Sequence, residues 1–243
     1  MNIQLTQNGI KPAIIGHLQA GVFEQLIEMA KETPGDDIAV TTIEEYRDTV
    51  FRVEGGSRVW KALVPFSKIG DAVAIGFQNW GAQIINIRQQ ALLLHLDPTR
   101  ASFDSAVDFH QDHPSLGLLA DGQKFCVRLL CASSLPTQLL DLTPLKDLEA
   151  FTKLLRPTHQ NRWRHGPDFD DTKIENFARS NGGFIRPKAG GVVVFDGSTI
   201  HRAFSASHAH IRALLNIDIQ MVMPRDATYR IKYGQRPRFF FAG

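Results

Sequence analysis

His110 and Asp112 stand two positions apart, and a further histidine, His201, follows much later in the chain. Residues i and i+2 of a β-strand point to the same side, so His110 and Asp112 could both reach one metal ion. Two imidazoles and one carboxylate can occupy one face of an octahedral Fe(II) ion and leave three positions open, an arrangement called the facial triad. The pattern therefore predicts that His110, Asp112 and His201 bind iron and are the catalytic residues.

Arg212 follows His201 by eleven positions (212 − 201 = 11) and lies in the apolar run 211–219. Its planar guanidinium is suited to paired hydrogen bonds with a carboxylate. A guanidinium in apolar surroundings also requires an anionic partner. We therefore expect Arg212 to bind a carboxylate, and the alternative to a ligand's carboxylate is a salt bridge to Asp196 or Asp218.

The ordered set of H-x-D, distal histidine and arginine resembles the Fe(II)/2-oxoglutarate-dependent dioxygenases. The sequence is most similar to the clavaminate synthase/taurine dioxygenase group within them. The resemblance covers about residues 75–220, and its matching positions are 109–114, Thr137, 195–201 and Arg212. It implies that Arg212 binds the far carboxylate of 2-oxoglutarate. It also implies that Thr137, which follows Asp112 by 25 positions (137 − 112 = 25), assists in that binding.

The activity that the resemblance implies is hydroxylation of a small polar molecule, such as an amino acid or a natural-product intermediate. Molecular oxygen and 2-oxoglutarate would be consumed, and succinate and CO2 released. Asp112 speaks against halogenation, because halogenases of this superfamily have a small residue in place of that carboxylate. Desaturation, cyclisation or a macromolecular substrate are alternatives, as is a non-catalytic cupin-like metal-binding protein. A nucleic-acid demethylase would carry a second arginine where this sequence has Asp218.

Two features of the spacing leave alternatives open. Asp112 and His201 are separated by only 88 residues (113 to 200), and the group usually has a longer insertion there. The shorter phytanoyl-CoA-hydroxylase-like group therefore remains an alternative. His208 and His210 compete with His201 for the third ligand position, but His208 would leave too few residues for the chain to turn and return at Arg212.

Composition is that of a soluble globular protein, with 43% hydrophobic and 21% charged residues. The net charge of +2 argues against a protein that coats nucleic acid. The apolar runs 91–94 and 191–195 are far too short to span a membrane. The N-terminal residues show no signal-peptide pattern. Cys126 and Cys131 are five apart in an expected strand and point to opposite sides, so we expect two reduced thiols in a cytoplasmic protein.

The periodicity predicts a mainly β fold with flanking helices and a double-stranded β-helix core, that is, a jelly roll of the cupin kind. We expect one domain over 1–243, with N-terminal helices at about 16–52 and the core at about 70–222. Helices are expected at 16–32, 42–52 and 144–155, with a break at Gly55-Gly56. Short runs of strand character are 72–77, 83–87, 90–96, 107–112, 125–132, 191–195 and 213–222.

The segment 157–183 is rich in polar residues and is expected to be a loop that covers the iron site, where Arg162, Arg164 or His165 could meet the substrate. The alternative is an exposed connector. The basic, aromatic stretch 225–241 is interpreted as a solvated face with an aromatic anchor, and the alternatives are binding of a nucleic-acid backbone or contact of one arginine with an anionic substrate. A nucleic-acid partner is not expected. The sequence predicts no oligomeric state and no specific primary substrate.

Overall fold

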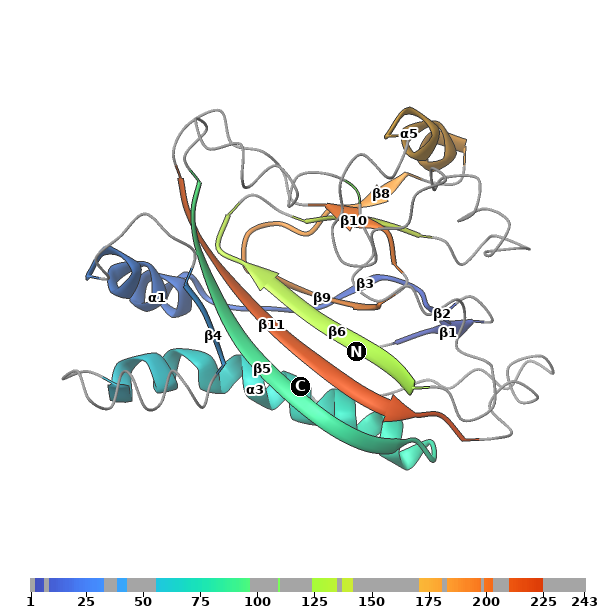
Figure 1. The fold of residues 1–243 in the computed structure, drawn as a ribbon, viewed down its shortest axis with the longest axis horizontal. Helices are drawn as coiled ribbons and strands as arrows, with labels where there is room; N and C mark the ends of the chain where they lie inside the picture. The colour runs from blue at the N-terminus through green and yellow to red at the C-terminus, as the bar shows by residue number, and fades with distance from the viewer. Residues whose placement is uncertain are drawn as a thin grey trace.

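The computed structural model describes residues 3–6, 9–32, 39–42, 56–96, 109, 124–134, 137–141, 171–180, 183–197, 199–202 and 210–224. Their elements, in chain order, are β1 (Leu5–Thr6), β2 (Gly9–Ile10), β3 (Ala13–His17), α1 (Ala20–Glu32), β4 (Ala39–Thr42), α3 (Gly56–Asn79), β5 (Gln83–Leu96), β6 (Lys124–Ala132), β7 (Gln138–Leu140), α5 (Asp171–Ser180), β8 (Phe184–Ile185), β9 (Gly191–Asp196), β10 (His201–Arg202) and β11 (His210–Val222). The fold of these residues is mainly β, with antiparallel sheets and three helices (Figure 1).

The larger sheet has six strands in the order β3-β9-β6-β11-β5-β4, and all of its pairs are antiparallel. The long strand β11 lies between β5 and β6 (Figure 1). β9 is buried along its whole length. A strand that is buried on both faces is expected to have a continuous apolar sequence, as Gly191–Phe195 has, and not an alternation of apolar and polar residues.

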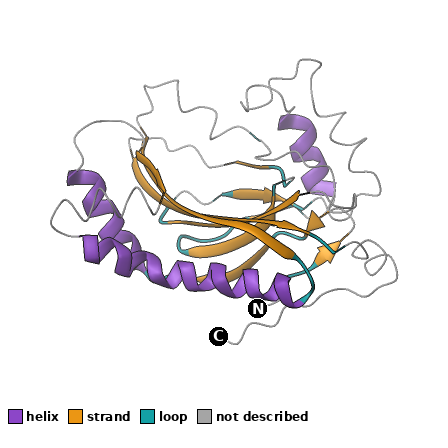
Figure 2. Cartoon of the chain, turned by 60° about the horizontal axis from the view of Figure 1, so that its bottom comes forward, coloured by secondary structure: helices purple, strands orange, loops and turns teal. Residues whose placement is uncertain are grey.

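Helices α1 and α3 cover one face of this sheet, and Figure 2 shows the long helix α3 running along it. Alternate residues of β6, such as Val127 and Leu129, pack in one core cluster with Phe66 and Phe77 of α3. Gly70 allows α3 to lie close to β11, because a Cβ at that position would lie 2.6 Å from the Cδ1 atom of Ile217.

A second, three-stranded sheet, β10-β7-β8, packs on the opposite face of the large sheet. The intervening cluster contains Leu139 of β7 and the other alternate set of large-sheet residues, including Leu130 and Phe195. The chain passes from one sheet to the other through a turn in which Thr199 N donates to Asp196 O at 3.0 Å. This turn leads from β9 directly to His201.

Helix α5 covers the outer side of the small sheet. Ile174 and Ala178, one helical turn apart, pack with Leu140, Ile200 and Phe109 in a separate cluster. Phe109 is fully buried there and stacks on the ring of Phe184, with 5.3 Å between the ring centroids.

Several predicted elements are confirmed. The expected strands at 125–132, 191–195 and 213–222 correspond to β6, β9 and β11. Both cysteines are free and buried. No helix in the described part of the chain is long and apolar enough to cross a membrane.

Other predicted elements are wrong. Residues 72–77 are not a strand but lie in α3, which begins at Gly56, where a helix break was expected. Residues 13–17 form β3, so the first helix starts at Ala20 rather than Gly16, and residues 39–42 form β4. The runs 83–87 and 90–96 are one strand, β5. The expected loop 157–183 contains the helix α5.

Some predictions lie outside the described residues. They are the helix at 144–155, all but Thr42 of the helix at 42–52, the strand at 107–112 apart from Phe109, the cover residues Arg162, Arg164 and His165, and the stretch 225–241.

Candidate functional site

His201 lies in β10 between the two sheets and is 4% exposed. Its Nδ1 atom is 3.0 Å from the carbonyl oxygen of Thr199, and because a carbonyl only accepts hydrogen bonds, Nδ1 carries the proton. In that tautomer the lone pair is on Nε2, the state of a metal-binding imidazole whose other nitrogen is held by a backbone carbonyl. The ring of Phe195 lies 5.0 Å away, centroid to centroid.

Thr137 directly precedes β7 and is 3% exposed. Strand β7 pairs with β10 so that Leu139 is the register partner of His201. Thr137 is two positions before Leu139, and extended chain alternates sides, so Thr137 belongs to the same side of the small sheet as His201. The structure therefore brings two of the predicted site residues to one side of one sheet.

Arg202 joins three segments behind this site. Its Nε atom donates to Gln138 Oε1 at 2.8 Å, and its Nη2 atom donates to Glu175 Oε1 of α5 at 3.4 Å. Its guanidinium carbon lies 4.0 Å from the ring centroid of Phe109. We call Phe109, Gln138, Glu175 and Arg202 the Arg202 cluster.

Members of the Arg202 cluster are chain neighbours of predicted site residues. Phe109 precedes His110, Gln138 follows Thr137, and Arg202 follows His201. Successive residues of a strand point to opposite sides, so Arg202 holds the strand from the side away from His201. The guanidinium makes its contacts with Gln138, Glu175 and Phe109 on that side. Arg202 is therefore not placed to bind a carboxylate on the side of His201.

His110 and Asp112 lie outside the described residues. Within the described ranges, no group of three or more His, Cys, Asp or Glu side chains is arranged to hold a metal ion. The one predicted ligand that is described, His201, fits the role because its tautomer leaves Nε2 as the donor atom. The donor set of two imidazoles and one carboxylate suits Fe(II).

Arg212 is described in its backbone only, where it pairs with Leu94 of β5. The two carboxylates that were its alternative partners have other contacts. Asp218 accepts from Arg128 Nε at 2.6 Å and from Arg128 Nη2 at 2.9 Å. Asp196 Oδ2 accepts from the backbone N–H of Ile10 at 2.6 Å.

Sequence reasoning missed two groups of residues near the site. The Arg202 cluster includes Glu175 of α5, a helix that was not predicted. The helical spacing of Ile174, Phe177 and Ala178 could have indicated that helix. The paired charges of Arg128 and Asp218 come from strands that are remote in sequence, and strand alternation alone would have placed each of them on a face but not beside the other.

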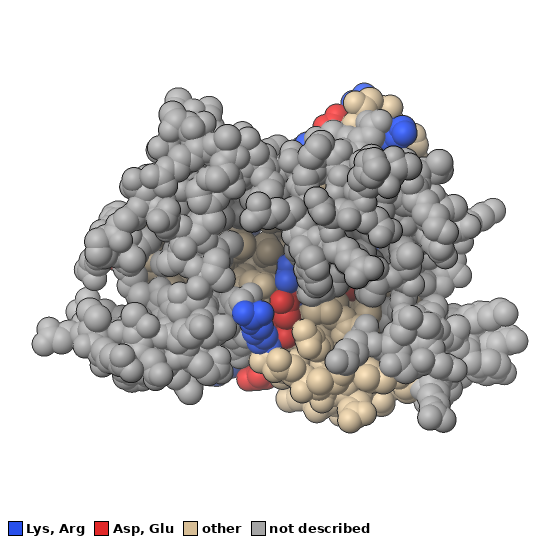
Figure 3. Space-filling view, in the orientation of Figure 1, with Lys and Arg blue, Asp and Glu red and all other residues tan. Residues whose placement is uncertain are grey.

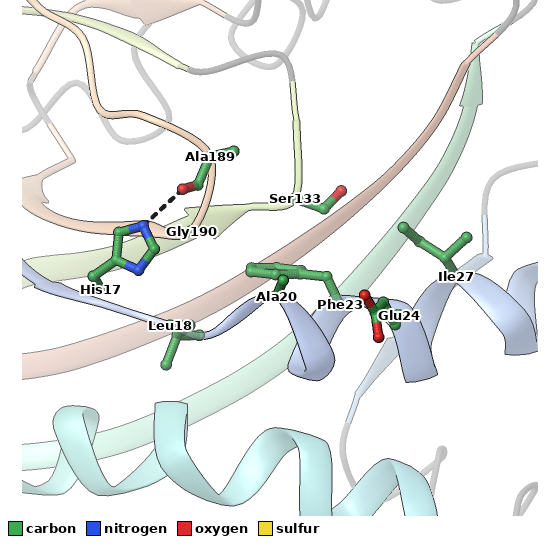
Figure 4. A pocket seen from close by; sticks show the side chains of 9 residues that line it. All are labelled: His17, Leu18, Ala20, Phe23, Glu24, Ile27, Ser133, Ala189 and Gly190. Carbon is green, nitrogen blue, oxygen red and sulfur yellow. Dashed lines mark hydrogen bonds between the residues drawn. The ribbon is translucent and has the colours of Figure 1, made fainter.

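A separate pocket of about 240 Å³ lies where β3 meets α1 (Figure 4). Phe23 and Ile27 line one side, and Ser133 and Gly190 the other. At its mouth the ring of His17 approaches the carbonyl oxygen of Ala189 at 2.9 Å from Nε2. None of the described residues that line it is a predicted site residue, so this pocket is distinct from the region around His201.

No family model and no curated protein matches the chain. Among solved structures, it is similar to the crystal structure of EvdMO1, with 16% sequence identity and a TM-score of 0.30. The match covers 57% of this chain and 28% of that chain, so it spans little more than a quarter of EvdMO1. A likeness of this size carries no argument about function.

Proposed function

We propose that this protein is an Fe(II)- and 2-oxoglutarate-dependent oxygenase that hydroxylates a small polar molecule. The observation that carries the proposal is the contact of Phe109 with Arg202, whose guanidinium carbon lies 4.0 Å from the ring centroid. Phe109 is the neighbour of His110 and Arg202 is the neighbour of His201. Adjacent Cα atoms are about 3.8 Å apart, so this contact limits how far apart the segments with the two histidines can lie.

The arrangement of the sheets supports a jelly-roll core. Two antiparallel sheets face each other across one apolar cluster, with His201 between them and helices outside. Closed or face-to-face antiparallel sheets are the architecture of cupin-like proteins. We propose that the whole chain forms one such domain.

In this proposal His110, Asp112 and His201 hold the iron. When bound, Fe(II) would supply the oxygen chemistry that couples decarboxylation of 2-oxoglutarate to oxidation of the substrate. Asp112 contributes the anionic ligand. The Nδ1–H of His201 donates to Thr199 O, which fixes the imidazole orientation and presents Nε2 as the donor.

Arg212 and Thr137 orient the cosubstrate. A guanidinium binds a carboxylate through two parallel hydrogen bonds, and a hydroxyl adds a third donor. Position 212 belongs to the alternate set of β11 that includes Leu214, which packs in the cluster between the sheets. The apolar residues Phe195 and Leu139 exclude water around the site, which strengthens polar interactions within it.

A screen of amino acids and other small metabolites for stimulated succinate release tests the proposed activity. The Fe(II)-loaded protein with 2-oxoglutarate and oxygen should release succinate faster when its substrate is present, and Asp112→Ala should abolish that release. Bound iron without any 2-oxoglutarate-dependent succinate release would favour the non-catalytic metal-binding alternative.

A further inference from the structure

Three charged residues stand next to one another across three strands of the large sheet. Arg128 of β6 and Asp218 of β11 are register partners, and Asp218 is also the register partner of Arg88 in β5. Paired residues of antiparallel strands lie on the same face of a sheet. We call Arg88, Asp218 and Arg128 the charged row.

The charged row lies on the face that carries the candidate site. Arg128 is the register partner of Phe195 in β9, and the ring of Phe195 lies 5.0 Å from that of His201. The strands of a sheet are about 4.8 Å apart, so Arg128 begins about one strand spacing beyond Phe195. A continuous line of side chains thus leads from His201 to Arg128, and the charged row continues it to Arg88.

The inner part of the row is partly buried and held in one geometry. The side chains of Arg128 and Asp218 are 14% and 9% exposed, and two hydrogen bonds of 2.6 Å and 2.9 Å join them. Arg88, at the outer end, is exposed. Figure 3 shows basic and acidic side chains side by side near the centre of this face.

The guanidinium groups of the row are suited to an anion. They belong to Arg88 and Arg128, whose strands lie on either side of Asp218. Guanidinium groups bind carboxylates with paired hydrogen bonds, and such bonds are stronger in a partly buried, low-dielectric position than in water. Asp218 fixes the orientation of Arg128, so less rotamer entropy is lost when a ligand binds.

We propose that the charged row binds a carboxylate group of the primary substrate, so that the substrates of this protein are small carboxylic acids such as amino acids. This rests on the proposed function for the identity of the reaction, but the binding of the acid itself needs no metal. The acid group would bind at Arg128 and Arg88, and the rest of the molecule would extend along Phe195 towards His201. This carboxylate site is distinct from the one assigned to 2-oxoglutarate at Arg212.

Thermal unfolding of the metal-free protein tests the proposal. The probes are the free acids of the common L-amino acids, each compared with its primary amide, which lacks the carboxylate. At least one acid should raise the unfolding temperature while its amide does not. Arg88→Glu should abolish that shift, and Arg88→Lys should retain part of it.

The matched control is Lys68→Glu, which makes the same change of charge at an exposed position in α3 on the other face of the sheet. It should leave the acid-dependent shift intact. The double variant Arg128→Gln with Asp218→Asn keeps the shape of the buried pair without its charge, and it should also lose the shift. An amide as effective as its acid, an equal shift in Arg88→Glu, or no shift with any acid would overturn the proposal.

Affinity for 2-oxoglutarate, measured in the anaerobic Fe(II) protein, separates this site from that of the cosubstrate. It should fall in Arg212→Ala and stay within about twofold in Arg88→Glu. A protein that binds neither Fe(II) nor 2-oxoglutarate but shows an acid-dependent shift lost in Arg88→Glu would refute the proposed oxygenase and support the acid site. A protein that binds Fe(II) and 2-oxoglutarate but shows no acid-dependent shift would refute the acid site alone.

Discussion

The guanidinium of Arg202 lies over the ring of Phe109, with 4.0 Å from its central carbon to the ring centroid. These residues are 93 positions apart in the chain (202 − 109 = 93). Because Phe109 is fully buried and Arg202 is also held by Gln138 and Glu175, the contact is a fixed junction between the segments that carry His110 and His201. We therefore expect the geometry of the proposed iron site to depend on that junction.

Arg202→Ala should therefore reduce both stability and iron affinity. Loss of a buried cation–π contact and of two hydrogen bonds, with Gln138 left buried, should cost about 2–4 kcal/mol of unfolding free energy. Fe(II) affinity should fall by roughly tenfold, the size of effect seen when groups that orient metal ligands are removed. Urea unfolding and anaerobic titration with Fe(II) measure the two quantities.

Arg179→Ala is the matched control for Arg202→Ala. Arg179 pairs with the same Glu175, at 3.5 Å, but its side chain is 75% exposed. An exposed pair of this kind contributes little, so stability should change by less than about 0.5 kcal/mol. Iron affinity in Arg202→Ala equal to that of Arg179→Ala would show that the junction does not position the ligands.

Arg212→Ala should weaken 2-oxoglutarate binding by roughly 2–5 kcal/mol, because one charge of a close pair is left without its partner. Iron binding should be largely retained, since Arg212 is not a proposed ligand. Titration of the Fe(II) protein with 2-oxoglutarate under anaerobic conditions measures the effect. Normal binding in Arg212→Ala together with weakened binding in Arg202→Ala would mean that the cosubstrate role belongs to Arg202.

Gly9→Ala should destabilise the turn that leads to His201. Gly9 has a φ of +108°, and a Cβ there would overlap the carboxylate of Asp196, which accepts from Ile10 N. Backbone strain and displacement of a buried carboxylate together should cost about 2–4 kcal/mol. Gly21→Ala, at a position in α1 with open space, should instead stabilise by about 0.5–1 kcal/mol. Equal unfolding midpoints for the two variants would contradict this assignment of Gly9.

Stability at alkaline pH should depend on Cys131. Burial raises the pKa of its thiol from 9.0 to about 12, so the folded protein keeps the neutral thiol over a range where the unfolded chain ionises. This contribution is complete below pH 9 and is lost as pH rises towards 12. Between pH 9 and 10 the wild type should lose about 1 kcal/mol more stability than Cys131→Ala. Equal losses of unfolding free energy in the wild type and Cys131→Ala, measured by urea unfolding, would contradict this role of Cys131.

Three strands of the large sheet, β6, β9 and β11, were predictable from sequence because their residue types fit their environment, whereas β3 and β4 were missed. β9 is an apolar run buried on both faces, and β11 alternates between the helix-covered face and the inner face. Helix α3 was missed because Pro65, Gly70 and Gly76 all disfavour helix in isolation. The spacing of Leu63, Phe66, Gly70, Val73 and Phe77 is nevertheless helical, and burial against the sheet outweighs local propensity.

For the site, residue types and spacing pointed to His201, and the family resemblance pointed to Thr137. Both lie buried on one side of the small sheet. The contacts that hold them there were not predictable in the same way. Arg202 meets Phe109 and Glu175, and Arg128 meets Asp218, only because distant segments are brought together by the sheet pairing. Register between remote strands depends on the whole fold, and no local pattern encodes it.

Absorption spectroscopy of the anaerobic protein with Fe(II) and 2-oxoglutarate tests the proposed iron and cosubstrate site most directly. Chelation of Fe(II) by 2-oxoglutarate in a site formed by His110, Asp112 and His201 should give a weak metal-to-ligand charge-transfer band in the visible range. The band should be absent in Asp112→Ala and His201→Ala. Iron bound to the wild type without that band, or a band that persists in both variants, would contradict the proposed site.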